Sequence, residues 1–205
     1  IENTAEASID MSEYGLGRLA LLSATDKKTA IEKMDGHGQG LDAGKRMEFL
    51  NNVLPKLGFT TNDKLFTDGM LTWEQVRSMN SNLIRFGAHT HNHPVMSRLS
   101  PEQAQFEIET SQKRIAAETG SPVRHFAYPY GSHTAINETA VKAVAACDFD
   151  SAVVLYNAPI NSEEPYRLGR VMVSEMRSMR PGGGFSRCLF ATEMSGLFDL
   201  LFARN

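Results

Sequence analysis

Phe86-Gly87-Ala88-His89-Thr90-His91-Asn92-His93-Pro94 is the stretch around which the rest of this chain is organised. It follows a short apolar run, residues 83–86, that predicts a buried strand. Its three histidines stand at alternate positions directly after that run. A neutral imidazole is a good nitrogen ligand near neutral pH, so such a cluster at a strand end is a candidate divalent-metal site.

Length and composition describe an ordinary globular protein. The 205 residues suffice for one domain, with 41% hydrophobic and 22% charged residues. The net charge of -3 argues against nucleic acid as a main partner, and no apolar run is long enough to span a bilayer. The chain opens with Ile1 and shows no signal peptide, so bacterial cytoplasm and cell envelope both stay open. Cys147 and Cys188 are expected to be free, buried thiols, with one disulfide as the alternative.

Residues 1–70 predict a helical region with two main helices. Residues 11–24 have partly helical apolar spacing, and residues 42–57 carry Met47, Leu50, Val53, Leu54 and Leu57 on one face, with Gly58 as a stop. The glycine-rich stretch 35–40 is expected to be a flexible break between them.

Strands and helices alternate from residue 71 onward. The expected helices begin after caps at Thr72, Ser100 and Asn137 and cover residues 73–79, 101–118 and 138–146, with a terminal helix over residues 185–202. The expected strands cover residues 83–86, 123–128, 151–155 and 168–173. This order predicts an α/β fold with parallel strands, in which sites lie beyond the carboxyl ends of the strands.

Two turns at predicted strand ends resemble motifs of the polysaccharide deacetylases, carbohydrate esterase family four. His89-Thr90-His91-Asn92-His93 is similar to the family's His-Ser/Thr-x-x-His motif. Phe126-Ala127-Tyr128-Pro129-Tyr130-Gly131 resembles the Arg-x-Pro-Tyr-Gly motif in the branch that lacks the Arg. The resemblance covers about residues 65–175. It implies a partial, deformed β/α barrel, with residues 1–70 as a helical insertion and residues 71–205 as the deacetylase-like region.

The resemblance implies a metal site at the first turn. His89 and His93 would be the ligands of a divalent metal, Zn²⁺ by preference, and His91 would not be one. Two imidazoles four positions apart across a turn can converge on one ion and leave positions for substrate and water. The metal would polarise an acetamide carbonyl and lower the pKa of bound water.

The resemblance also implies catalytic and substrate-binding residues. The backbone N–H of Tyr130 would stabilise the oxyanion of the transition state. Substrate binding is expected of Thr90, Tyr128, Pro129 and Arg170, with the Tyr128 ring as part of a sugar-stacking wall and Arg170 as a replacement for the missing arginine. For both tyrosines, packing within the turn is the alternative.

Two parts of the family pattern are absent from the sequence. The Thr-Phe-Asp-Asp-Gly motif, which supplies a base and a third metal ligand, does not occur, and no histidine follows His133 to form the late Leu-x-His motif. Phe66-Thr67-Asp68-Gly69 is only superficially similar, so Asp68 is a minor alternative ligand. We therefore expect an N-terminally truncated domain, whose exposed strand edges an upstream segment or an oligomer would cover.

Three functions stay open at this point. The first is a metal-dependent hydrolase of C–N amide bonds, other than peptide bonds, that removes N-acetyl groups from a polysaccharide or oligosaccharide; the 205 residues alone would be inactive. The second is a truncated or degenerate domain that binds saccharide or metal without turnover. The third is a metal-binding α/β scaffold unrelated to sugars.

Overall fold

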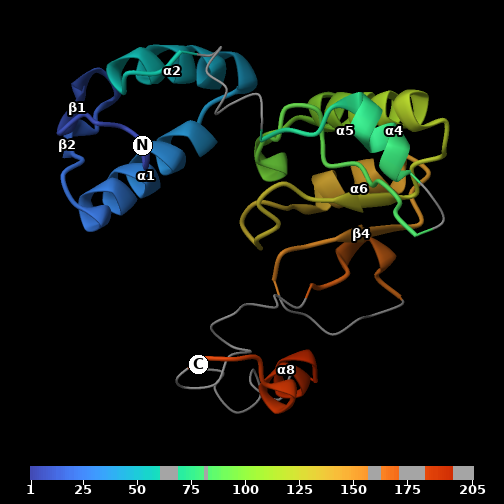
Figure 1. Ribbon diagram of the computed structural model, residues 1–205. Coiled ribbons are helices and arrows are strands. Elements are labelled where there is room, and N and C mark those ends of the chain that lie inside the picture. The colour runs from blue at the N-terminus through green and yellow to red at the C-terminus, as the bar shows by residue number, and fades with distance from the viewer. Residues whose placement is uncertain (61–68, 81–82, 157–162, 171–182, 196–205) are drawn as a thin grey trace. The chain divides into compact units, whose positions relative to one another are not determined.

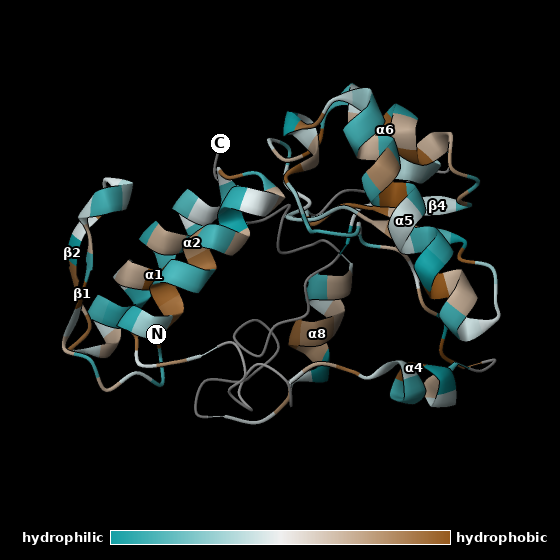
Figure 2. Ribbon diagram, turned by 90° about the horizontal axis from the view of Figure 1, so that it is seen from above, coloured by the Kyte–Doolittle hydropathy of each residue, from teal (hydrophilic) through white to brown (hydrophobic). Residues whose placement is uncertain are grey.

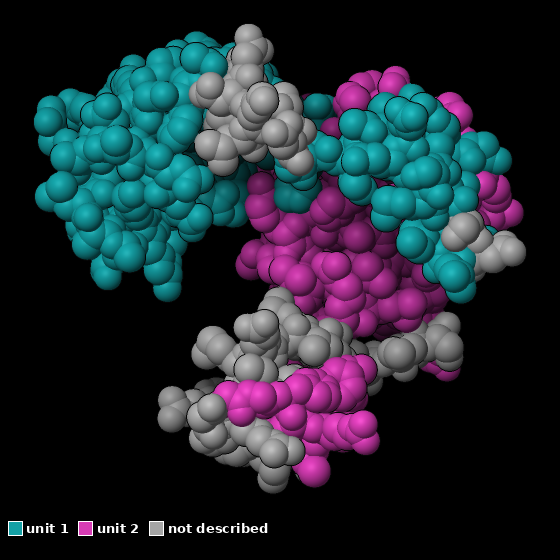
Figure 3. Space-filling model, in the orientation of Figure 1, with its two compact units in different colours: residues 1–85, 92–94, 118–120 teal, residues 86–91, 95–117, 121–205 magenta. Residues whose placement is uncertain are grey.

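The computed structural model describes residues 1–60, 69–80, 83–156, 163–170 and 183–195. The chain divides into two compact units, which Figure 3 distinguishes by colour. Unit 1 comprises residues 1–85, 92–94 and 118–120, and unit 2 comprises residues 86–91, 95–117 and 121–205. The division at residue 70 stays a prediction.

Unit 1 begins with a β-hairpin. Strand β1 (Ser8–Met11) pairs antiparallel with β2 (Gly17–Ala20), and a 3-10 helix (Ser12–Tyr14) connects them. The helix predicted for residues 11–24 is therefore wrong. Ile9 and Met11 are the buried, alternate residues of β1, and Leu19 is the buried residue of β2. Gly15 and Gly17 turn the chain at φ +72 and +68, values that glycine adopts without strain.

The glycine-rich stretch after the hairpin is helical. Helix α1 (Ala24–Gln39) begins at a capping box formed by Ser23 and Asp26 and continues through Gly36 and Gly38. The flexible break predicted at residues 35–40 is thus wrong. The helix buries one side in the core of unit 1, and this packing outweighs the cost of about 1 kcal/mol that each glycine adds.

Helix α2 (Ala43–Lys56) confirms the second predicted helix. The Asp42 side chain caps it by accepting the N–H of Lys45, and Gly58 follows it at φ +78. The predicted buried face is only partly right, because Met47 and Leu50 are exposed. Phe49 is buried instead, since its ring packs edge-on against Tyr14 at 4.8 Å. Figure 2 shows hydrophilic and hydrophobic residues along both α1 and α2.

Unit 2 contains a short parallel sheet. Strand β3 (His125–Ala127) pairs parallel with β4 (Ser151–Val153). Parallel bridges from Ala88 to Phe126 and from Val153 to Leu168 extend the pairing on both sides. The predicted α/β fold with parallel strands is therefore confirmed, while the partial barrel stays a prediction.

The strand predicted for residues 83–86 is wrong. Leu83 is 96% exposed, Ile84 is also exposed, and pairing begins only at Ala88. A Cβ placed on Gly87 would lie 2.8 Å from the carbonyl oxygen of His125, so the two backbones approach closely where the pairing starts. The apolar run therefore lies before the paired segment.

Three further helices begin at the predicted caps. They are α4 (Trp73–Met79) in unit 1, α5 (Pro101–Thr119), and α6 (Glu138–Ala145), and their caps are Thr72, Ser100 and Asn137. Helix α8 (Arg187–Met194) falls within the predicted terminal helix, whose residues 196–202 lie outside the described residues. Residues 171–173 of the last predicted strand also lie outside them.

The core of unit 2 forms where α5 and α6 cover the sheet (Figure 1). Ile108 of α5 and Val144 of α6 are fully buried with Phe126 of β3. Ala140 completes the inward face of α6, whereas Ala145, which the spacing places inward, is exposed. This packing holds the carboxyl ends of the strands in a defined position.

Both cysteines are free, but their surroundings differ. Cys147 is buried and Cys188 is exposed, so the expectation of two buried thiols is wrong for Cys188. Burial raises the pKa of the Cys147 thiol and lowers its thiolate fraction. We expect iodoacetamide at pH 8 to label Cys188 within minutes and Cys147 only after denaturation, as measured by peptide mass spectrometry. Equal labelling of both cysteines in the native protein would contradict this assignment.

Candidate functional site

The two motif turns begin at the same edge of the sheet in unit 2. The N–H of Ala88 donates to the carbonyl of His125 at 2.8 Å, and the N–H of Ala127 donates to the carbonyl of Ala88 at 2.9 Å. His89 and Tyr128 therefore follow directly after neighbouring, parallel segments. This is the carboxyl edge, where α/β sheets place their sites.

The imidazole ring of His89 is held by a hydrogen bond to a backbone carbonyl, which determines which ring nitrogen carries a proton. Nδ1 lies 2.7 Å from the carbonyl oxygen of Ala127. A carbonyl oxygen only accepts, so Nδ1 carries the proton, and in the neutral ring the lone pair is on Nε2. Metal-binding histidines are held in this way by a carbonyl behind the ring. The side chain of His89 is exposed, as a ligand open to substrate requires.

Strained backbone gathers at the two turns. Thr90, His93 and Tyr130 adopt positive φ angles of 65, 53 and 60, and Asp148 is the fourth non-glycine residue of this kind among those the structure describes. Such residues cost about 1–3 kcal/mol each and persist where the surroundings hold them. The concentration at both motifs marks these turns as the candidate site.

Helix α5 holds the histidine turn from one side. The backbone N–H of His91 donates to Oε2 of Glu107 at 2.9 Å, and its ring lies edge-on to Phe106 at 6.2 Å. Thr90 donates its hydroxyl proton to the carbonyl of His89 at 2.6 Å, so toward a sugar hydroxyl this oxygen acts as an acceptor. The contacts with Glu107 and Phe106 account for the position of His91 without a metal bond.

Glu107 is a residue of the site that the sequence analysis missed. Its side chain is largely buried, with 7% of the residue exposed, although it carries a carboxylate. A signal existed, because Glu107 lies three positions after Ala104 and beside Ile108, two apolar residues at helical spacing that are buried in α5. An acid on such a face requires a partner, and here the partner is the histidine turn.

We expect Glu107→Ala to destabilise unit 2 by about 1.5–3 kcal/mol, because it leaves the N–H of His91 without its charged acceptor. Glu107→Gln keeps an acceptor oxygen of the same shape, so its loss of stability should be less than half of the loss in Glu107→Ala. Urea unfolding followed by circular dichroism measures both. Equal losses in the two variants would show that the hydrogen bond does not stabilise the turn.

The first residues of the second turn are buried. Tyr128 is 1% exposed, its hydroxyl donates to the carbonyl of Tyr166 at 3.0 Å, and its ring lies edge-on to Phe126 at 5.2 Å. Burial also raises the pKa of its phenol. This ring offers no face to a sugar, which favours the packing role over the stacking role. Pro129 is buried as well.

Tyr130 and Gly131 complete the second turn against the end of β4. The N–H of Leu155 donates to the carbonyl of Gly131 at 2.8 Å, and Gly131 lies so close that a Cβ would meet Leu155 atoms at 2.6 Å. Tyr130 is partly exposed. These contacts fix the backbone at Tyr130, whose N–H is the group that the resemblance implies for the oxyanion.

Arg170 lies at the same edge, and strands β3 and β4 separate its segment from that of Ala88. It follows Leu168, which bridges to Val153, and its Nε donates to the carbonyl of Val154 at 2.8 Å. The residue is otherwise exposed. Its guanidinium is thus held near the carboxyl end of β4.

The donor chemistry of the histidine turn fits two ligands of a zinc ion. His89 presents Nε2, and His93 is exposed four residues later in the same turn. Within the described ranges, no three His, Cys, Asp or Glu side chains are grouped as a metal site, and Asp68 lies outside those ranges. Nor does any described helix have the length and apolarity to cross a membrane.

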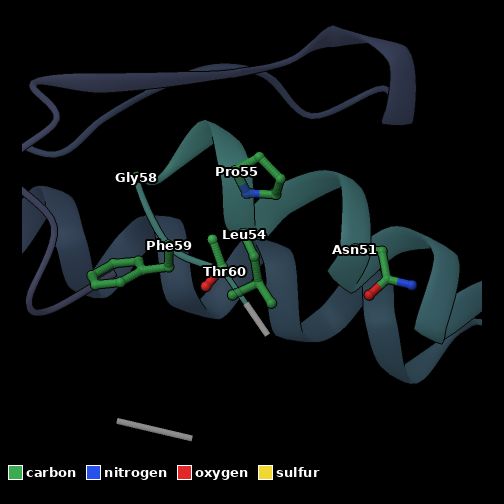
Figure 4. A pocket seen from close by; sticks show the side chains of 6 residues that line it. All are labelled: Asn51, Leu54, Pro55, Gly58, Phe59 and Thr60. Carbon is green, nitrogen blue, oxygen red and sulfur yellow. The ribbon is translucent and has the colours of Figure 1, made fainter. Parts of the chain in front are cut away.

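A cavity of about 430 Å³ lies in unit 1, at the end of α2 (Figure 4). Its lining consists of Asn51, Leu54, Pro55, Gly58, Phe59 and Thr60. None of these side chains ionises near neutral pH or binds metal well. The cavity therefore lacks the chemistry that the two turns carry.

Together, the sheet and its turns define an α/β protein with a histidine-bearing turn and a Pro-Tyr-Gly turn at adjacent strand ends. The family model described as polysaccharide deacetylase matches residues 49–152, about half of the chain. The chain belongs to the polysaccharide deacetylase family. No curated protein matches it.

Several solved structures are similar to part of the chain. The deacetylase PplD of Streptococcus pyogenes, in complex with acetate, is 24% identical over 49% of this chain and 43% of its own, with a TM-score of 0.45. The deacetylase domain of BpsB from Bordetella bronchiseptica is 22% identical over 50% and 49%, with a TM-score of 0.45. A carbohydrate esterase family four pseudoenzyme from Bacillus anthracis is 24% identical over 39% and 27%, with a TM-score of 0.36. The chain thus spans less than half the length of each of these proteins.

Proposed function

We propose that this protein is a metal-dependent hydrolase that removes N-acetyl groups from a polysaccharide or oligosaccharide. Membership of the polysaccharide deacetylase family supports the reaction class. The single observation that carries the metal assignment is the hydrogen bond from His89 Nδ1 to Ala127, which gives Nε2 the lone pair. His93 is the second ligand in this proposal, and zinc is the preferred ion.

The metal, when bound, supplies a Lewis acid for the acetamide carbonyl and for water. The chain's own part is to orient the substrate and to receive developing charge. The strained Pro129-Tyr130-Gly131 turn, fixed on β4, would present the N–H of Tyr130 to the oxyanion. Thr90 would accept a hydrogen bond from a sugar hydroxyl. Pro129 is buried, so it would fix the path of the turn rather than touch the substrate.

Arg170 is the proposed source of positive charge at this edge. The branch to which this chain is similar lacks the arginine of its Pro-Tyr-Gly motif, and Ala127 stands in that place. Arg170 follows the outer segment of the same parallel sheet, and its Nε bond to Val154 holds the guanidinium there. A fixed cation beside developing negative charge stabilises a transition state more than a mobile one.

A second candidate function is saccharide or metal binding without turnover. One observation favours it, because the 205 residues contain no Asp-Asp-Gly triplet to supply a base for water. In both proposals the histidine turn binds the metal. They differ in whether amide bonds are broken.

Acetate release from N-acetylglucosamine oligomers distinguishes the two functions. We would assay the complete product of the gene beside residues 1–205, each loaded with zinc. The hydrolase proposal expects release by the complete product, its loss in a His93→Ala variant, and little or none by residues 1–205. No release by the zinc-loaded complete product, with oligomer binding retained, would contradict hydrolysis and leave the binding function.

A further inference from the structure

Arg46 of helix α2 holds the backbone of the histidine turn. Its Nη2 donates to the carbonyl of Asn92 at 2.9 Å, and its Nη1 donates to the carbonyl of His93 at 3.0 Å. Arg46 and residues 92–94 belong to the same compact unit. One planar guanidinium thus binds two consecutive carbonyl groups.

These two carbonyls belong to the peptide planes on either side of the His93 Cα. Fixing both planes fixes φ and ψ at His93, and with them the direction of its Cα–Cβ bond. His93 has a positive φ of 53, a conformation that a histidine keeps only where its surroundings hold it. The fork of Arg46 supplies such a hold, because its donors are set in one rigid plane.

We propose that Arg46 is a positioning residue that aims the imidazole of His93 at the metal. This inference rests on the proposed metal site. Nothing in the local sequence around the histidines indicates the link, because 46 residues separate Arg46 from Asn92.

The charge of Arg46 makes the test specific. A cation near a metal site repels Zn²⁺, so removal of that charge alone would strengthen zinc binding. Removal of a contact that positions a metal ligand instead weakens zinc binding, typically by about 10- to 100-fold. The two effects have opposite signs.

The experiment is zinc titration of residues 1–205 by calorimetry, without substrate. We expect Arg46→Ala to lower zinc affinity about tenfold, and Arg46→Lys to fall between it and the wild type, since an ammonium cannot bind both carbonyls in the fork geometry. Lys45→Ala is the matched control, because it removes the same charge one position earlier, where the side chain faces Asp42. It should change affinity less than about twofold.

An unchanged or higher affinity in Arg46→Ala would overturn the proposal. Should Arg46→Ala fail to fold by circular dichroism, Arg46→Lys decides, and a zinc affinity equal to that of the wild type overturns it. A His93→Ala variant separates this inference from the function. If His93→Ala weakens zinc binding but Arg46→Ala does not, only the positioning role fails. If the zinc affinities behave as expected but the complete product releases no acetate, only the hydrolase proposal fails.

Discussion

His89→Ala is expected to weaken zinc binding by more than about 100-fold and to abolish acetate release by the complete protein. The reason is that Nε2 of His89 is the donor whose orientation the Ala127 carbonyl fixes. Loss of a ligand should exceed the roughly 10- to 100-fold that loss of an orienting group costs. Calorimetric zinc titration measures the first effect, and an acetate assay measures the second.

His91→Ala is the matched control for that variant. It removes an imidazole two positions away in the same turn, but its backbone N–H to Glu107 remains. Its effect on zinc affinity should stay within about twofold, as for most surface substitutions. A larger loss in His91→Ala than in His89→Ala would reverse the assignment of ligands.

Gly131→Ala is expected to destabilise unit 2 by about 3 kcal/mol or more and to displace the Pro-Tyr-Gly turn. Gly131 has a φ of +57, and an added Cβ would meet the backbone nitrogen and Cβ of Leu155 at 2.6 Å. Backbone strain and overpacking each cost about 1–3 kcal/mol. Urea unfolding measures the loss of stability.

Gly120→Ala provides the comparison, because Gly120 also has a positive φ, of +64, but a Cβ there would meet nothing within 4 Å. It should cost about 1 kcal/mol, the strain of the left-handed conformation alone. Equal losses in the two variants would show that Leu155 yields to the added methyl group. The second turn would then be less constrained than its contacts indicate.

Sequence patterns predicted the features that depend on a few neighbouring residues. The caps at Thr72, Ser100 and Asn137 were right because a cap is a hydrogen bond within three residues. The parallel strands and their two special turns followed from strand–helix alternation. The two turns resembled the motifs of the polysaccharide deacetylases, and this resemblance suggested His89 as a metal ligand and Tyr130 as an oxyanion donor.

Features that depend on distant contacts could not be predicted in the same way. The hairpin at residues 8–20 was missed because the apolar spacing over residues 11–24 predicted a helix, whereas Gly15 and Gly17 turn the chain there so that β2 pairs with β1. The stacking role of Tyr128 lost support because its side chain is buried and its hydroxyl donates to the carbonyl of Tyr166, 38 residues away. The bond from Arg46 to His93 spans 47 residues and has no local signature.

The central claim is that His89 and His93 together hold one zinc ion. Zinc K-edge absorption spectroscopy of the loaded protein tests it, with protein concentration kept well above the dissociation constant. We predict two imidazole nitrogens at about 2.0–2.1 Å from the zinc in the wild type, and one in each of the variants His89→Ala and His93→Ala. A wild-type spectrum without imidazole, or an imidazole count that neither variant changes, would contradict the claim.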